Sequence, residues 1–467
     1  MPLSAVHTHR HRLRHAQQGA ASLQDTLPVE LVRYIIRLAT DVPIAFDTRH
    51  ESVMDEDRTR TRREIVESLR TKRSLSLVSK SLHILVDEYM HEIILLTRFP
   101  GCTALQLFAS FLRTTRRHHT PRQRIRPRGE RVRRLELDFR VNSPWTTSWD
   151  SLWGLLPACP NVELLIFQPV CQAWMLEWSL GVRNGDGPLF HGRDCLGFDH
   201  PSGAVYSVTC SEVFARTVTK KYCGTLRRLE LAQSCELPEP YLQPMLSGLP
   251  NLEVIRSAHL QVSLGHNSSS ITTNWSGTLP LPQQGQQLHT LLLQSTRGLK
   301  ALRQPSPQLR HLSILNGRVS PVRSGDRDLL RQHAATIVSL YYQEFDCEES
   351  LPGIIDILPN LEHLRLLDWP KARWNNVFPP QIHPNLRTVT LFRTLSHSQE
   401  NSLFGQMSQL VKAVEEGRLP KLDKIRLGAC DHHRGGWDDV QPAFARLGIT
   451  IEEREDLRPW YGSFPYR

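Results

Sequence analysis

The stretch Leu358-Pro359-Asn360-Leu361-Glu362-His363-Leu364-Arg365-Leu366 carries the pattern from which the fold can be predicted. Its second half has the form L-x-x-L-x-L, and its first half contains a Pro-Asn pair. Apolar side chains that alternate with polar ones over a few residues are typical of a strand with one buried face. A Pro-Asn pair is a turn signal. The stretch therefore predicts a turn that leads directly into a short strand.

Clusters of the same form recur along the chain, and four of them share the Pro-Asn lead-in. Successive clusters start 21 to 36 residues apart, apart from one interval of 64 residues. Most intervals match or slightly exceed the roughly 20 to 29 residues of a leucine-rich repeat. A unit of one strand and one return cannot bury its own leucines, so such units stack and share a core. The clusters begin at Val132, Val162, Leu226, Leu252, Leu288, Leu309, Ile337, Leu361, Leu386 and Leu422.

The fold class predicted is α/β: a small helical module, then an irregular solenoid of short parallel strands with helical or irregular returns. A globular α/β domain with parallel strands is the alternative. The long interval could hide a degenerate repeat near Val205 to Val208. We expect a disordered basic arm over 1–25, a helical module over 26–98, and a helix and Arg-rich linker over 99–131. The solenoid is expected over 132–455 and a tail over 456–467.

The polar positions between the leucines predict a target-binding surface. Side chains alternate across a strand, so these residues point away from the buried face, toward the expected concave side. The later repeats are neutral to basic there, which favours an acidic or phosphorylated segment. A solvated surface that binds nothing is the alternative. The predicted target-binding residues are Arg134, Glu136, Arg228, His363, Arg365, Lys424 and Arg426.

Apolar stripes at helical spacing precede the repeats. Leu31, Tyr34, Ile35 and Leu38 form the first stripe, after a start at which Asp25 or Thr26 could cap the helix and Pro28 fits its first turn. A second helical segment is expected from Ile65 to Val86. A third stripe, Tyr89 to Leu96, is expected to close the module near Arg98, and 104–112 are expected to be helical.

The N-terminal stripes carry a family resemblance. Leu27-Pro28-x-Glu30-Leu31, followed by Leu75-x-Leu77-Val78-Ser79-Lys80-Ser81-Leu82, resembles the F-box motif. Together with the repeats, the chain resembles F-box proteins with leucine-rich repeats, especially the irregular fungal kind. It departs from the family in the longer stretch between the two halves of the motif, and in Leu82, where many members carry an aromatic residue. The repeats also lack the usual Asn/Cys ladder.

The resemblance implies a substrate receptor of a cullin–RING ubiquitin ligase, located in the cytoplasm, the nucleus or both. The F-box would dock on an SKP-family adaptor and through it on a cullin, and the repeats would hold an unknown target protein. Such a receptor supplies proximity rather than bond chemistry, so we expect no enzymatic activity and no cofactor. The residues that the resemblance assigns to adaptor binding are Leu27, Pro28, Glu30, Leu31, Ile35, Leu77, Val78 and Leu82.

Charge and cysteine usage bear on the alternative functions. The formal net charge is +10, and ten arginines but a single acid fall between Arg113 and Arg134. A nucleic-acid-associated repeat protein that uses this stretch is therefore the main alternative, although we do not expect nucleic acid or a membrane as a partner. A plain scaffold is a third hypothesis. The nine cysteines are odd in number and contain no C-x-x-C pair, which argues against a disulfide framework or a zinc module.

No motif for a nucleotide-binding loop, a zinc protease or a serine hydrolase occurs. The histidines His7, His9, His11 and His15 could bind a metal by crowding, but surrounding arginines repel a cation. The segment Asp431-His432-His433 contains possible ligands without a fixed framework. A turn after the last clear repeat explains that segment more simply.

Overall fold

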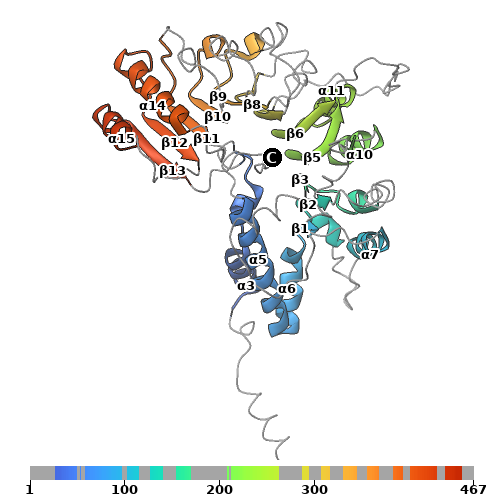
Figure 1. Ribbon diagram of the computed structural model, residues 1–467. Coiled ribbons are helices and arrows are strands. Elements are labelled where there is room, and N and C mark those ends of the chain that lie inside the picture. The colour runs from blue at the N-terminus through green and yellow to red at the C-terminus, as the bar shows by residue number, and fades with distance from the viewer. Residues whose placement is uncertain are drawn as a thin grey trace, which may run out of the picture. The chain divides into compact units, whose positions relative to one another are not determined.

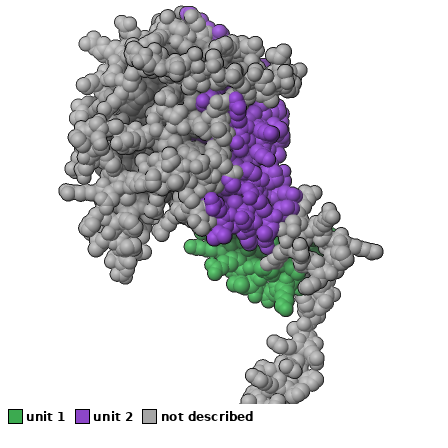
Figure 2. All heavy atoms as spheres, turned by 90° about the vertical axis from the view of Figure 1, so that its right-hand side faces the viewer, with its two compact units in different colours: residues 1–46, 58–92 green, residues 47–57, 93–467 purple. Residues whose placement is uncertain are grey.

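The computed structural model describes two compact units of the chain (Figures 1 and 2). Each unit is considered by itself. The first contains the helices that precede the repeats, and the second contains the repeats together with the segment Asp47–Asp57. The described residues are 27–49, 53, 58–96, 102–114, 127–139, 154–169, 208–209, 212–261, 287–293, 307–315, 330–343, 355–367, 382–392, 400–428 and 437–454.

The first unit is helical. Its small core joins Val32 and Ile36 to Leu85 and Val86, and Arg33 clamps Glu88 through a two-pronged ion pair. Val32 and Ile36 are four residues apart and therefore share one face of their helix. The elements are α3 (Val29–Thr40), a 3-10 turn η1 (Pro43–Phe46), α5 (Arg58–Val78) and α6 (Lys80–Met90).

The start of the first helix and the continuity of the second predicted helical segment differ from the sequence prediction. Pro28 stands just before α3 and accepts the amide hydrogen bonds of Leu31 and Val32, so it caps the helix rather than lying inside its first turn. Asp25 and Thr26, the predicted caps, lie outside the described residues. The second predicted segment is split, because the Ser79 side chain accepts the amide of Leu82 and starts a new helix there.

The second unit is built on one parallel sheet, in agreement with the solenoid-like α/β class. Within the described residues, the sheet has thirteen strands, and apart from β4 they lie in sequence order. Every pairing is parallel. The strands are β1 (Ile93–Leu96), β2 (Arg134–Phe139), β3 (Leu164–Pro169), β4 (Val208–Thr209), β5 (Arg228–Pro238), β6 (Val254–Gln261), β7 (Thr290–Leu293), β8 (His311–Leu315), β9 (Ser339–Gln343), β10 (His363–Leu367), β11 (Thr388–Phe392), β12 (Lys424–Gly428) and β13 (Thr450–Arg454).

All ten apolar clusters predicted as strands contain one. The third predicted helical stripe is wrong over Ile93–Leu96, which instead forms β1 and pairs with β2. β-branched isoleucines side by side fit a pleated sheet better than a helix. A last strand, β13, follows the predicted clusters. In the long interval, β4 pairs with β5 away from the main path, while Val205 lies outside the described residues.

Helices lie on one side of this sheet. The aligned positions Leu135, Leu165, Leu229 and their successors form an unbroken buried row that packs with the helices in one core. We call this side the core face. The helices are α7 (Cys102–Arg113), α10 (Glu212–Tyr222), α11 (Glu239–Gly248), α14 (Glu400–Glu415) and α15 (Trp437–Arg446). Two 3-10 turns, η2 (Arg128–Arg131) and η3 (Leu156–Ala158), precede β2 and β3.

The predicted linker is ordered where it approaches the repeats. Residues 115–126 lie outside the described residues. Arg128, however, is buried and places its guanidinium 4.4 Å from the centre of the Phe111 ring. Gly129 is also buried. The turn η2 therefore belongs to the first repeat, not to a flexible connector.

Candidate functional site

The helical unit carries an exposed apolar surface on α3. The side chains of Leu31, Tyr34, Ile35 and Leu38 are 48%, 59%, 50% and 64% exposed. Their spacing of three and four residues puts them on one side of the helix, opposite the buried Val32 and Ile36. The core of the unit therefore uses one face of α3 and leaves the other uncovered. We call these four side chains the α3 surface.

The residues predicted to bind an adaptor divide into two groups. Leu27 and Leu82 pack against the core of the helical unit, so much of their apolar area is used inside it. Leu77 and Val78, at the end of α5, are 78% and 69% exposed. The other predicted residues, Pro28, Glu30, Leu31 and Ile35, are exposed.

The side of the sheet opposite the core face holds the predicted target-binding residues. We call it the polar face. It carries two aligned rows of side chains. One row comes from the residue before each buried leucine, and the other from the residue after it. The first row contains Arg134, Leu164, Arg228, Val254, Thr290, His311, Ser339, His363, Thr388 and Lys424. The second contains Glu136, Ile166, Glu230, Arg256, Leu292, Ser313, Tyr341, Arg365, Thr390, Arg426 and Glu452.

Charges at the start of the polar face are buried in ion pairs. Arg134 donates from Nε to Glu136 at 2.7 Å, and these side chains are 2% and 6% exposed. Two repeats on, Glu230 accepts from Arg228 at 2.6 Å and lies 3.4 Å from Arg256. Because these carboxylates and guanidiniums pair with one another, they are poorly placed to form ion pairs with a partner.

The other end of the polar face is more open. Lys424 and Arg426 both bind Glu452, at 2.8 and 3.0 Å, and their side chains are 32% and 22% exposed. Hydrogen bonding to Lys424 lowers the pKa of Glu452, although burial opposes this. Arg365 is buried. Of the predicted basic anchors, Lys424 and Arg426 are therefore the ones with accessible surface.

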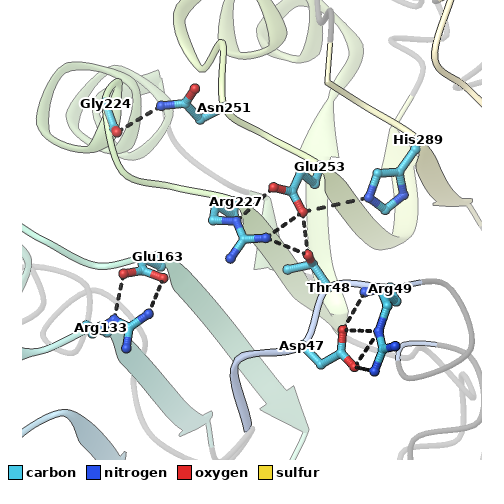
Figure 3. Close-up of polar contacts among 10 residues, drawn as sticks. All are labelled: Asp47, Thr48, Arg49, Arg133, Glu163, Gly224, Arg227, Asn251, Glu253 and His289. Atoms are coloured by element: carbon cyan, nitrogen blue, oxygen red, sulfur yellow. Dashed lines mark hydrogen bonds and ion pairs between the residues drawn. The ribbon is translucent and has the colours of Figure 1, made fainter. Parts of the chain in front are cut away.

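A second charged series stands one residue before the strands (Figure 3). Arg133 binds Glu163 through two hydrogen bonds of 2.6 and 2.9 Å. Arg227 binds Glu253 in the same way, at 2.7 and 3.0 Å. Burial alone would raise the pKa of Glu253, but hydrogen bonds from His289, Arg227 and Thr48 lower it to about 2. Opposite charges in neighbouring repeats thus help to fix the register of the stack.

The lead-in asparagines join successive repeats. Asn161 donates its side-chain amide to the carbonyl of Glu130 at 2.6 Å, and Asn251 donates to Gly224 at 2.9 Å. Asn360 and Asn385 make the equivalent bonds to Ala335 and Pro359. Each acceptor lies three residues before the residue that directly precedes a strand: Arg133, Arg227, Val338 and Glu362. We call these four bonds the lead-in asparagine ladder. The sequence indicated a turn at these asparagines, but not these hydrogen bonds.

We expect replacement of Asn161 by alanine to lower the free energy of unfolding by about 1 kcal/mol. The change leaves the half-buried carbonyl of Glu130 without the donor shown by the structure. Urea unfolding followed by circular dichroism measures the effect. Asn161→Asp, which keeps the size of the side chain but removes the donor, should be at least as damaging. A wild-type midpoint in both variants would contradict a structural role for the ladder.

The basic stretch makes internal contacts wherever it is described. Arg113 donates to the carbonyl of Gly154 at 2.7 Å. Arg128 stacks on Phe111, and Arg133 and Arg134 are paired with glutamates. These four arginines are therefore engaged within the repeats.

Comparisons with known proteins do not place the chain in a family. No family model matches the chain, and no curated protein matches it. None of the helices in the described part of the chain has the length and apolar character needed to cross a membrane. Among the same residues, no group of three or more His, Cys, Asp or Glu could hold a metal ion. His7 to His15 and Asp431 to His433 lie outside them.

Proposed function

We propose that the chain is a substrate receptor of a cullin–RING ubiquitin ligase. Its helical unit docks on an SKP-family adaptor, and its repeats bind a target protein. The observation that carries this proposal is the α3 surface: four large apolar side chains exposed along one side of a helix whose other side already fills a core. The helix begins directly after Leu27-Pro28, where the sequence resembles the F-box motif.

A contiguous apolar surface of this kind favours a protein partner. Large exposed apolar patches on a folded unit mark interaction sites, because their contact with water is unfavourable. Leu77 and Val78 extend the apolar character to the junction of α5 and α6. Side chains at helical spacing suit a groove or a helix in the partner. The adaptor is therefore the occupant that we propose for the α3 surface.

The repeats would then hold the target near a separate ubiquitin-charged enzyme. Their contribution is proximity and orientation of the target, without bond chemistry in this chain. For the target contact, we propose the accessible end of the polar face, where Lys424 and Arg426 share a single carboxylate. The accessible surface of these two cations favours an acidic or phosphorylated segment.

The adaptor contact can be tested with the double variant Leu31→Glu and Ile35→Glu. Both side chains are about half exposed, so the unit should stay folded, while two carboxylates on the α3 surface should abolish capture of purified adaptor. We prefer these positions to Leu27, whose packing against the core would mix a folding defect with a binding defect. Pull-down with immobilised adaptor measures binding, and circular dichroism of the full chain measures folding.

Arg70→Glu is the matched control, since it makes the same change of two charges at an exposed position of α5. It should bind the adaptor like the wild type. Undiminished capture by the double variant would show that α3 is not the docking surface. Capture should also survive high salt, because it rests on apolar contacts. Binding of nucleic acid through the basic stretch, the alternative function, would weaken steeply as salt rises.

A further inference from the structure

A short segment between α3 and α5 in the sequence belongs structurally to the repeats. Asp47–Asp57 groups with the second unit, whereas Phe46 and Arg58 on either side of it belong to the helical unit. Of this segment, Asp47, Thr48, Arg49 and Val53 are described. We call Asp47–Val53 the strap. It falls in the stretch that makes the two halves of the F-box-like motif unusually distant in sequence.

Thr48 joins the strap to the charged series before the strands (Figure 3). Its hydroxyl donates to the carboxylate of Glu253 and accepts from Arg227 at 3.1 Å. Thr48 is only 4% exposed. A hydroxyl that both donates and accepts satisfies a carboxylate and a guanidinium together, which neither an alkyl group nor an acid could do.

The backbone next to Thr48 is held as well. The guanidinium of Arg228, in the first position of β5, donates to the carbonyl of Asp47 at 3.3 Å. The Asp47 carboxylate accepts the amide of Arg49 at 2.9 Å, and the carbonyl of Arg49 accepts the amide of Val53 at 2.9 Å. These bonds fix the described residues Asp47, Arg49 and Val53 relative to one another.

This local conformation brings Val53 onto an apolar part of the polar face. Val53 is 2% exposed and forms a buried cluster with Val254 and Leu292. These two side chains interrupt the charged and polar rows on β6 and β7. We call Arg227, Arg228, Glu253, Val254 and Leu292 the seat. It combines two cations, one anion and an aliphatic patch.

We propose that the seat is a peptide-binding site, filled in this structure by the chain's own strap. The chemistry of the seat selects a segment with a neutral hydroxyl residue followed, five positions later, by an aliphatic residue. A target segment of that kind competes with the strap, which makes the strap an internal inhibitor. That a target protein supplies such a segment rests on the proposed function, whereas the occupancy of the seat by the strap does not.

Competition follows from simple linkage. If the strap fills the seat most of the time, an added peptide binds only the fraction of molecules whose seat is empty, and its apparent affinity falls by that fraction. Two hydrogen bonds and one buried valine can account for a reduction of about tenfold or more. Loss of the strap should therefore raise the affinity by the same factor.

Hydrogen exchange on the full chain tests the occupancy. In the double variant Thr48→Val and Val53→Asp, the hydroxyl is lost and a charge faces the aliphatic patch. Amides of the strap should then exchange at least about tenfold faster than in the wild type. Arg49→Ala is the control, since the Arg49 side chain lies in the strap but is 80% exposed. Equal exchange in the double variant and the wild type would refute the occupancy.

A labelled synthetic peptide of residues 43–57 tests the binding site. By fluorescence anisotropy, it should bind the double variant at least about tenfold more tightly than the wild-type chain. A peptide with Thr48→Val and Val53→Asp should not bind the double variant. Equal binding of the wild-type peptide to both chains, or no binding to the double variant up to millimolar peptide, would overturn the proposal. Adaptor capture, measured on the same variants, reports separately on the proposed function.

Discussion

Replacement of Glu230 by alanine is expected to lower the free energy of unfolding by about 3 to 5 kcal/mol. Glu230 is the carboxylate between Arg228 and Arg256 on the polar face, and the exposed fractions of these guanidiniums are only 1% and 7%. Without Glu230, two buried positive charges lose a carboxylate that contacts both of them. Removal of one partner from a buried pair costs far more than the pair itself contributes, because the remaining charge stays desolvated.

Two matched variants separate this effect from a simple loss of contacts. Glu362→Ala removes an exposed pair with Arg387, with 41% and 53% exposure at 3.8 Å, and should cost less than about 1 kcal/mol. Arg134→Met with Glu136→Leu removes both members of a buried pair and should be close to neutral. Urea unfolding of the full chain measures all three. A Glu230→Ala midpoint equal to that of Glu362→Ala would mean that water reaches the guanidiniums.

The spacing of the leucines was sufficient to predict the strands. The L-x-x-L-x-L clusters each contain one strand, and the residues between the leucines lie in two rows on the opposite face, as alternation requires. The same alternation could have predicted the buried pairs. In Arg134-x-Glu136 and Arg228-x-Glu230, opposite charges two residues apart share one face of a strand. The sequence pattern predicts that Arg134, Glu136 and Arg228 bind a target, whereas in the structure Arg134 pairs with Glu136 and Arg228 with Glu230.

Other features depend on contacts between residues far apart in the sequence. Asp47–Val53 reads as part of a charged, turn-rich stretch, and nothing local indicates that Thr48 meets Glu253, 205 residues away. Similarly, Ile93–Leu96 continues an apolar stripe and becomes a strand because β2 offers it a hydrogen-bonding edge. Tertiary pairing overrides local pattern in such short segments. The exposed side of α3, in contrast, follows directly from its helical spacing.

Replacement of Gly129 by alanine is expected to destabilise the first repeat by about 3 kcal/mol or more. Gly129 is buried in η2, where a methyl group built on its backbone would overlap the carbonyl oxygen of Ala158 in the next repeat. The obstacle is main chain and cannot rotate away, so the two turns would have to separate. Their separation would also strain the hydrogen bond from Asn161 to Glu130, which joins the same two repeats.

Gly154 offers the matched control for Gly129. It precedes η3, is not fully buried, and has open space where a methyl group would stand. Gly154→Ala should therefore be neutral, or stabilising by up to about 1 kcal/mol, because alanine restricts the unfolded chain. Thermal unfolding and hydrogen exchange of β2 and β3 distinguish the two variants. If Gly129→Ala keeps wild-type stability, η2 does not pack against η3, and the stretch before Val132 is the flexible linker that its composition predicts. If only Gly129→Ala is destabilising, the stacked repeats begin at η2 or before it. Gly129 then stands where two main chains come too close for any side chain.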